Sequence, residues 1–377
     1  MLMLLCSPSV LDGTGEVNPT LVAALIQAAE SGHLVGLVSN HPKPVWFGQF
    51  FDGSKVAFAQ VRGRQSGAFI QSLAGQYSLR PYDVLALAAN DTDVHMGKNA
   101  GALLLAAGWA NSDLVNRLGI RVEDAGQFEE VLGLVTAWPG QWWYAGDTPS
   151  LAIHALADLS TYGKSVDQQV FAQKLTATVK HGGSRLQALL SITARSLLMD
   201  GVGAQKDLLW GVYPSSNSTN LDEEILSEFT HRLRTTVSRV RFAKPGEPLF
   251  IRHWPSQKRS SGGAVNRADP SEQLQTVHLN PVYQRTLAGR HVIVLDDCVT
   301  YGVSFAVASG LLIKAGAAKV SGIALGKFGN KLNQYAISIN SDPFQAVPAG
   351  KFSWSHHGPF PGSSHGSVQT SLQALVP

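Results

Sequence analysis

Two kinds of hydrophobic pattern alternate along the chain. Short runs of consecutive apolar residues predict strands that are buried on both faces of a sheet, as parallel strands are. Between them, apolar residues recur every three or four positions, as in Val17, Leu21, Ala24 and Ala28, which predicts helices packed on such sheets. The apolar runs lie at residues 1–6, Leu34–Val38, Asp83–Ala88, Asp207–Val212, Val292–Leu295 and Val320–Leu325. Alternating strands and helices predict an α/β protein with two doubly wound parallel-sheet domains.

Residues that begin and end helices support these boundaries. Asn18 is a capping residue and Pro19 suits the first helical position, so a helix should begin there and end near Gly32. A later helix should begin at about Leu221, with three acids in its first turn. Another should end at Gly316, because glycine is the commonest residue just past a helix.

One apolar run is followed by a distinctive group of polar residues. After Val292–Leu295 come two adjacent carboxylates, Asp296 and Asp297, and then the small, hydroxyl-bearing loop Thr300–Ser304, which leads into an apolar helix. Ligands of open α/β sheets bind outside the carboxyl ends of the strands. The N–H groups at a helix N-terminus attract anions. The pattern therefore predicts a site for a phosphorylated ligand at this edge of the sheet.

Each residue type has a role in such a site. Gly302 lets the backbone approach an anion, and Thr300 and Ser304 add hydroxyl donors. The carboxylates of Asp296 and Asp297 can accept hydrogen bonds from the vicinal hydroxyls of a ribose, and they can help to hold a hydrated Mg²⁺ ion. The simpler alternative is an ordinary strand edge with two solvated acids.

The segment VIVLDDCVTYGVS resembles the signature of type I phosphoribosyltransferases, in which an apolar strand leads into two acids and a Thr/Gly/Ser-rich loop. Tyr301 departs from that signature, because a small residue is usual at its position. The resemblance implies that the two acids are catalytic residues and ligands of Mg²⁺. It also implies that loop residues 300–304, including Val303, bind phosphoribosyl pyrophosphate. The positions that match residue by residue are Asp296, Asp297, Thr300, Gly302 and Ser304.

The same resemblance implies two further contacts with the substrate. Just after the fourth apolar run, Tyr213, Ser215 and Ser216 stand where the family binds pyrophosphate through backbone N–H groups. Lys258 and Arg259 stand in a segment that is similar to the mobile loop of the competence-associated members, whose basic residues contact the pyrophosphate. The alternatives are an ordinary strand-to-helix turn for the first segment and a solvated loop for the second.

The first part of the chain resembles the haloacid dehalogenase-like hydrolases. That family has a D-x-D-G-T loop, a Ser or Thr at the end of its second strand, and an acidic loop followed by N-A-G. The corresponding segments here are Val10–Thr14, Ser39 and Asn90–Gly101. The family's nucleophilic Asp corresponds to Val10, which can neither attack phosphorus nor bind Mg²⁺. Three acids remain, which either gather a metal ion or cap helices and turns: Asp12, Asp91 and Asp93.

The length of 377 residues exceeds that of one average domain and predicts two. We expect a degenerate haloacid dehalogenase-like domain over residues 1–110, a connecting segment over residues 111–160, and a phosphoribosyltransferase domain with a C-terminal hood over residues 161–377. Aromatic residues crowd in the connecting segment, where packing between domains is favoured over an exposed ligand platform. They are Trp138, Trp142, Trp143 and Tyr144.

Composition narrows the classes of partner. With 44% hydrophobic and 15% charged residues the chain is typical of globular proteins, and a net charge of +3 indicates neither a nucleic-acid nor a membrane partner. Only two cysteines, Cys6 and Cys298, are present, which argues against a disulfide framework and favours a reducing, cytoplasmic compartment. The apolar start MLMLLC lacks basic residues and is too short to cross a bilayer.

We therefore expect a transferase that moves ribose 5-phosphate between phosphoribosyl pyrophosphate and a nitrogen nucleophile such as a nucleobase. Its cofactor would be Mg²⁺, and its second substrate a small-molecule acceptor that the sequence does not identify. One alternative is a regulatory protein that binds phosphoribosyl pyrophosphate or a nucleotide without turnover. Another is a phosphatase that uses the first domain. Whether the chain forms a homodimer is left open.

Overall fold

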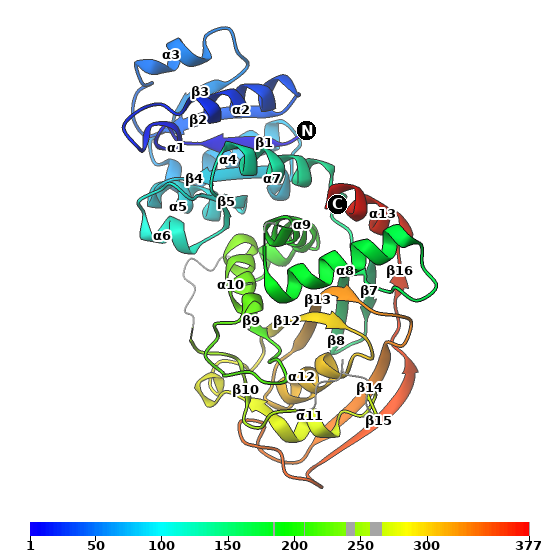
Figure 1. Ribbon diagram of the computed structural model, residues 1–377. Coiled ribbons are helices and arrows are strands. Elements are labelled where there is room, and N and C mark those ends of the chain that lie inside the picture. Colours follow the sequence, from blue (N-terminus) through cyan, green and yellow to red (C-terminus); the bar gives the residue numbers. More distant parts are fainter. Residues whose placement is uncertain (184, 207, 239–245, 257–265, 377) are drawn as a thin grey trace. The chain divides into compact units, whose positions relative to one another are not determined.

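The computed structural model describes residues 1–183, 185–206, 208–238, 246–256 and 266–376 (Figure 1). The chain forms two compact units, and each is described by itself. The first extends beyond residue 110 and takes in two later segments of the chain, whereas the second contains the acid doublet. The first unit comprises Met1–Gly140, Gln187–Gln205 and His231–Ala243, and the second comprises Gln141–Leu186, Lys206–Thr230 and Lys244–Pro377.

A six-stranded sheet in the order β3-β2-β1-β4-β5-β6 forms the centre of the first unit, and all its neighbouring strands pair in parallel. The strand order reverses between β1 and β4, so the crevice for a ligand is expected outside their carboxyl ends. The strands are β1 (Met3–Cys6), β2 (Leu34–Ser39), β3 (Ala57–Gln60), β4 (Val84–Ala88), β5 (Leu103–Ala107) and β6 (Ile120–Val122).

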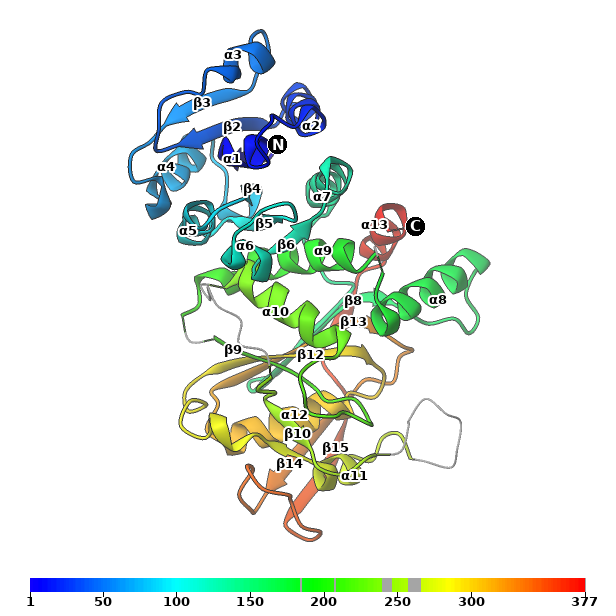
Figure 2. The same ribbon diagram turned by 60° about the vertical axis from the view of Figure 1, so that its left-hand side comes forward.

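Helices cover both faces of this sheet: α2 and α7 lie on one face, and α4, α5 and α6 lie on the other (Figures 1 and 2). The predicted start of α2 is confirmed, because the Asn18 side chain accepts hydrogen bonds from the backbone N–H groups of Thr20 and Leu21. The helices are α1 (Ser9–Asp12), α2 (Pro19–Glu30), α3 (Trp46–Phe51), α4 (Ala68–Gln76), α5 (Asp91–Ala100), α6 (Asp113–Arg117) and α7 (Ala125–Ala137), with a 3₁₀ turn, η1 (Arg64–Ser66).

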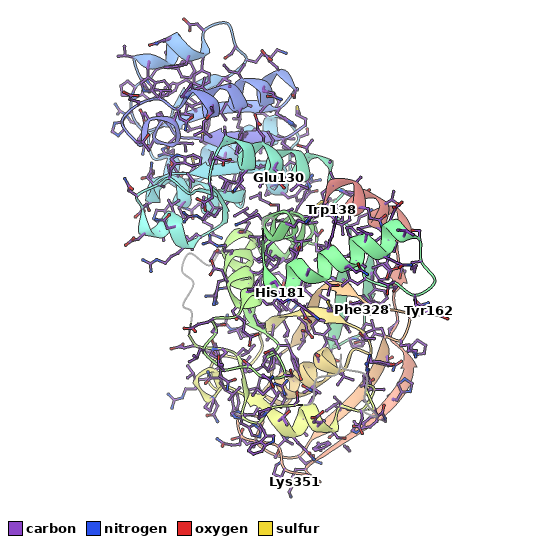
Figure 3. All side chains as sticks on the ribbon, viewed as in Figure 1. Glu130, Trp138, Tyr162, His181, Phe328 and Lys351 are labelled. Carbon is purple, nitrogen blue, oxygen red and sulfur yellow. The ribbon has the colours of Figure 1, made fainter. Side chains whose placement is uncertain are left out.

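Helix α9 (Arg185–Met199) joins the first unit through buried polar contacts. Trp138 follows the last residue of α7 and is labelled in Figure 3. It donates its indole N–H to the Ser196 hydroxyl at 2.9 Å. The guanidinium of Arg195 donates to the carbonyl of Tyr82 at 2.7 Å and contacts the carboxylate of Asp83 at 3.3 Å. Trp138 is thus a packing residue of this unit and not an exposed ligand platform.

The sheet of the second unit has the order β16-β7-β8-β13-β12-β9, and it is mixed rather than wholly parallel. Its four strands β8, β13, β12 and β9 pair in parallel, but β7 is antiparallel to β8, and β16 is antiparallel to β7. The tight turn between Asp147 and Leu151 is the reason, since so short a connection can join only antiparallel strands. The strands are β7 (Tyr144–Asp147), β8 (Leu151–Asp158), β9 (Leu208–Val212), β12 (His291–Val299), β13 (Lys319–Lys327) and β16 (Ser363–Ser364).

Helices α8 and α12 lie on opposite faces of this sheet (Figures 1 and 2). Two small antiparallel sheets complete the unit: β10 (Phe250–Arg252) with β11 (Val277–Leu279), and β14 (Asn333–Ile339) with β15 (Phe352–Pro359). The remaining helices of this unit are α8 (Val166–His181), α11 (Ser271–Thr276), α12 (Val303–Lys314) and α13 (Gly366–Leu375). Helix α10 (Ile225–Val237) belongs to this unit up to Thr230 and to the first unit from His231.

Helix α10 begins at Ile225, four residues later than the sequence predicted, because Asn220 and Asp222 adopt positive φ angles that interrupt a helix. The end of α12 next to Gly316 agrees with prediction. Among the described residues, no helix is both long and apolar enough to cross a membrane.

Candidate functional site

The acid doublet lies at the carboxyl edge of the second sheet. The pairing of β12 with β9 ends at Leu295, opposite Val212, whereas its pairing with β13 continues to Val299, opposite Lys327. The sequence suggested that Asp296 and Asp297 follow the strand. In the structure they belong to it. They lie where one neighbouring strand has already ended, so that their half-buried side chains reach the edge of the sheet.

Hydrogen bonds fix both carboxylates. The N–H of Asp297 donates to Oδ1 of Asp296 at 2.9 Å, and the N–H of Cys298 donates to Oδ1 of Asp297 at 2.6 Å. The hydroxyl of Ser304 also donates to Asp296. Burial, followed by the charge of Asp297, raises the pKa of Asp296 well above its ordinary value, because both effects disfavour the ionised form. Burial and the two acids likewise raise the pKa of the Cys298 thiol.

The loop from Thr300 to Ser304 turns directly into α12. Gly302 immediately precedes the helix with φ of +82°, a left-handed conformation that favours glycine. The first N–H groups of α12 have no acceptor within the helix and face the loop. A Cβ at Gly302 would lie 2.8 Å from Cδ1 of Leu332. This glycine is thus required by the turn and by packing, so replacing it would not test phosphate binding cleanly.

Tyr301 contacts two residues of the segment that follows β13. Its carbonyl accepts from the N–H of Asn333 at 3.1 Å, and the ammonium of Lys331 lies 5.9 Å from the centre of its ring. Val303 is buried at the start of α12, whereas Thr300 and Ser304 are half-buried, and the Ser304 hydroxyl bonds Asp296. The two hydroxyl residues therefore remain the side-chain candidates for contacting a ligand.

A second loop lies beside the first, because β9 and β12 are adjacent parallel strands. The N–H of Tyr213 donates to the carbonyl of Leu295 at 2.8 Å, which ties the start of the second loop to β12. The Tyr213 side chain is buried and donates to Oε1 of Gln273 at 2.9 Å, so it supports the loop from behind. Ser215 is exposed and Ser216 is half-buried. Lys258 and Arg259 lie outside the described residues.

The structure brings Lys327, which the sequence analysis did not single out, to the same edge. It is the last residue of β13, pairs with Val299 and Asp158 in register, and is only 3% exposed. Its ammonium lies 5.4 Å from the ring centre of Trp143 and 5.2 Å from that of Tyr144. Burial lowers the pKa of Lys327. The sequence does contain a signal for this residue, because Lys327 closely follows the apolar run Val320–Leu325.

The two acids supply only part of a metal site. Among the described residues, no cluster of three or more His, Cys, Asp or Glu side chains could hold an ion. Asp296 and Asp297 each keep a second oxygen beyond the one bonded to a backbone N–H. Two adjacent carboxylates fit Mg²⁺ when phosphate oxygens and water complete the octahedron, which is the usual way proteins bind this ion with substrates.

The first unit has a separate cleft of about 530 Å³ at the carboxyl edge of its own sheet. It lies outside β1 and β4, where the strand order reverses. Asn90 caps α5 here and also donates to the Ser9 hydroxyl at 3.0 Å. Polar side chains dominate its lining, and they include Ser7, Ser9, Asp12, Ser39, Asn40, His41, Arg64, Asn90 and Asp91.

The D-x-D-G-T-like segment does not lie where the sequence alignment put it. Strand β1 ends at Cys6, and Ser7 follows it directly, whereas Val10 and Asp12 belong to the short helix α1. Ser39 does end β2, as expected. Asp93 is buried and binds Arg64 and Ser7, so it is not open to a metal ion together with Asp12 and Asp91.

Comparison of the chain with protein-family models, with curated proteins and with solved structures finds no match. A proposal of function therefore depends on the chemistry of the two sheet edges. The second edge combines two fixed carboxylates, two strand-to-helix loops and a helix N-terminus. This set suits a ligand that carries both hydroxyl and phosphate groups.

Proposed function

We propose that the second unit is a phosphoribosyltransferase that binds phosphoribosyl pyrophosphate with Mg²⁺ and transfers ribose 5-phosphate to a nitrogen nucleophile. One observation carries the proposal: Asp296 and Asp297 lie in β12 beside the end of β9, and the chain turns from them through Gly302 into α12. Only a few residues therefore separate two kinds of group. The carboxylates can accept hydrogen bonds from ribose hydroxyls, and the N–H groups at the helix N-terminus can donate to a phosphate.

In this proposal each part of the substrate has its own partner. The 5-phosphate binds to the first N–H groups of α12 and to the hydroxyls of Thr300 and Ser304. The ribose hydroxyls donate to Asp296 and Asp297, which also contact Mg²⁺. The pyrophosphate meets the loop that contains Ser215 and Ser216. The adjacency of β9 and β12 supports this division.

Such a site would accelerate transfer mainly by positioning and by electrostatic stabilisation. The bond from the sugar to pyrophosphate breaks as positive charge develops on the ribose ring. A bound Mg²⁺ would favour the ionised form of Asp296, whose pKa is raised by burial without it, and would supply positive charge for the departing pyrophosphate. The carboxylates of Asp296 and Asp297 would stabilise the charge on the ribose, and backbone N–H groups would stabilise the pyrophosphate. No side chain needs to form a covalent bond with the sugar.

Calorimetric titration of the full chain with phosphoribosyl pyrophosphate and Mg²⁺ tests the proposal. We expect Asp297→Asn to weaken binding about 10- to 100-fold, the loss typical of a hydrogen bond to a charged group. Asp147→Asn is the matched control, because Asp147 is exposed at the opposite edge of the same sheet, where it contacts Lys319. Unchanged affinity in Asp297→Asn with a folded protein would refute the assignment.

Turnover distinguishes a transferase from a protein that only binds the donor. The full chain is incubated with phosphoribosyl pyrophosphate, Mg²⁺ and a panel of free bases, and release of pyrophosphate is followed. We expect release that depends on one class of base and that Asp297→Asn reduces. Tight donor binding without release for any base would favour the regulatory alternative.

A further inference from the structure

Arg252, the last residue of β10, is buried beside the loop that follows β9. Only 4% of its surface is exposed, although it carries a charge. Its backbone is held as well, since its N–H donates to Oδ1 of Asn220 at 2.8 Å. A buried arginine is costly unless its donors are well used, so its hydrogen bonds indicate what it is for.

The guanidinium binds two successive carbonyl groups of that loop. Nε donates to the carbonyl of Ser215 at 2.6 Å, and Nη2 donates to the carbonyl of Pro214 at 3.1 Å. The next carbonyl, that of Ser216, accepts from the N–H of Ser256 at 3.1 Å. Three consecutive carbonyls of the loop are therefore drawn to one side, toward the segment that follows β10.

This arrangement fixes the direction of the loop's N–H groups. In a trans peptide unit the C=O of one residue and the N–H of the next point in opposite directions, and the described residues contain no cis peptide bond. The N–H groups of Ser215 and Ser216 consequently point away from Arg252, and that of Asn217 points away from Ser256. These three residues are exposed or half-buried, and a row of N–H donors on one side of a loop suits an anion.

Other side chains hold the guanidinium in place. Nη1 donates to Oγ1 of Thr276 at 3.0 Å, and Nη2 also donates to Oε1 of Gln273 at 2.8 Å. Gln273 in turn accepts from the Tyr213 hydroxyl and donates to the Ser256 hydroxyl. Within the part of the chain that is described, the guanidinium bonds only neutral oxygens. The carboxylates of Glu272 and Asp296 act on its charge and oppose the larger effect of burial, which lowers the pKa of Arg252. The guanidinium therefore serves here to hold the loop and not to supply charge to a ligand.

We propose that Arg252 is a positioning residue, which holds the loop Pro214–Ser216 so that its N–H groups bind the pyrophosphate of the substrate. The inference rests on the proposed function, because it assigns the pyrophosphate to this loop. Arg252 acts through the loop backbone and does not itself touch the substrate. The 5-phosphate site at α12 does not depend on it.

The test separates the two anion sites by titrating the full chain with pyrophosphate and with ribose 5-phosphate. Arg252→Lys keeps the positive charge but loses the fork that spans two carbonyls. We expect at least a tenfold weaker affinity for pyrophosphate and for phosphoribosyl pyrophosphate, with affinity for ribose 5-phosphate within twofold of wild type. Arg285→Lys, an exposed position of the same unit, is the matched control and should change neither.

A milder variant guards against misfolding. Thr276→Val removes one hydrogen bond to the guanidinium and leaves both loop contacts, so we expect pyrophosphate affinity to fall about two- to fivefold. If Arg252→Lys does not fold, unchanged pyrophosphate affinity in Thr276→Val overturns the proposal.

Two further results would overturn the proposal. One is wild-type affinity for pyrophosphate in folded Arg252→Lys. The other is an equal loss of affinity for both ligands, which would indicate general damage and not loss of loop positioning. Failure of the proposed function gives a different result, since wild type would then bind pyrophosphate but neither ribose 5-phosphate nor phosphoribosyl pyrophosphate.

Discussion

Replacing Asp296 by asparagine should make the second unit more stable while weakening its binding of the donor. The raised pKa of Asp296 means that the folded protein disfavours its ionised form, first through burial and then through the charge of Asp297. Asparagine removes the charge and keeps the shape. Its Oδ1 can still accept from the N–H of Asp297, and the Ser304 hydroxyl can still donate to the side chain. Its NH2 group can donate to the Asp297 carboxylate in place of the hydrogen bond that the two carboxyl groups share.

The substitution removes only the free-energy cost of the buried Asp296 charge, so this cost sets the change in stability. We expect the free energy of unfolding at pH 8 to rise by about 1 kcal/mol, the usual gain when an unfavourable charge is removed. In a unit of this size the gain corresponds to an increase in Tm of about 2–4 °C. Donor binding should weaken about 10- to 100-fold, because a charged acceptor for the ribose hydroxyls is lost.

The pH dependence gives the sharper test. Because the pKa of Asp296 is higher in the folded than in the unfolded protein, the folded state binds more protons between the two values, and its stability falls as pH rises through this window. Below the unfolded pKa, near 4, Asp296 is protonated in both states and carries no penalty. The difference in Tm between Asp296→Asn and wild type should therefore be small near pH 4 and grow as pH rises.

Thermal unfolding followed by circular dichroism from pH 4 to pH 8, without ligand, measures this difference. Asp147→Asn is again the control, since Asp147 is exposed and should give a small difference at every pH. An asparagine variant that is less stable than wild type at pH 8 would refute the reasoning. So would a difference in Tm that does not vary with pH.

Three shorter predictions follow from other contacts. Gly302→Ala should lower the free energy of unfolding by about 1–2 kcal/mol because of its positive φ, and adding Leu332→Ala should not restore it, as thermal unfolding of both variants can show. Lys98→Met should cost about 2–3 kcal/mol in chemical denaturation, because Lys98 donates to two carbonyls at the end of α10, that of Thr235 within the helix and that of Ser238 just after it. With Mg²⁺, the first unit of the full chain should not hydrolyse phosphate monoesters. Any background hydrolysis should therefore persist in Asp12→Asn.

The elements that the sequence predicted well are those with strong local signals. Asn18 and Pro19 begin α2 as predicted, because a side-chain cap and a fixed φ act within one turn. Val292–Leu295 is fully buried between two parallel neighbours, as its unbroken apolar run indicated. These features need no information about distant residues.

The missed features depend on contacts between segments that are far apart in sequence. The strand β12 continues past the acids because β13 provides partners up to Lys327, which no local pattern in the acid doublet could show. Arg252 is recognisable as a support for the loop only once β10 is placed beside Pro214 and Ser215. Both side chains are buried. The apolar run that Lys327 ends is a local signal for it, but nothing local distinguishes Arg252 from a solvated arginine.

The chemistry of the cleft in the first unit likewise depends on contacts between distant residues, which the sequence does not show. Hydrolysis through an aspartyl phosphate needs a carboxylate at the end of the first strand, and the residue there is Ser7, whose hydroxyl donates to Asp93 at 2.7 Å. Asp93 also forms a salt bridge of 2.5 Å with Arg64, and the two side chains are only 1% and 6% exposed. Separating this pair would cost about 3–5 kcal/mol, so Arg64 is not free to bind a phosphate. Asp12, one of the three acids that the sequence analysis named here, accepts from the Trp46 indole at 3.1 Å. Groups that in isolation suggest catalysis thus bond one another, and the cleft is built without the nucleophile that hydrolysis requires.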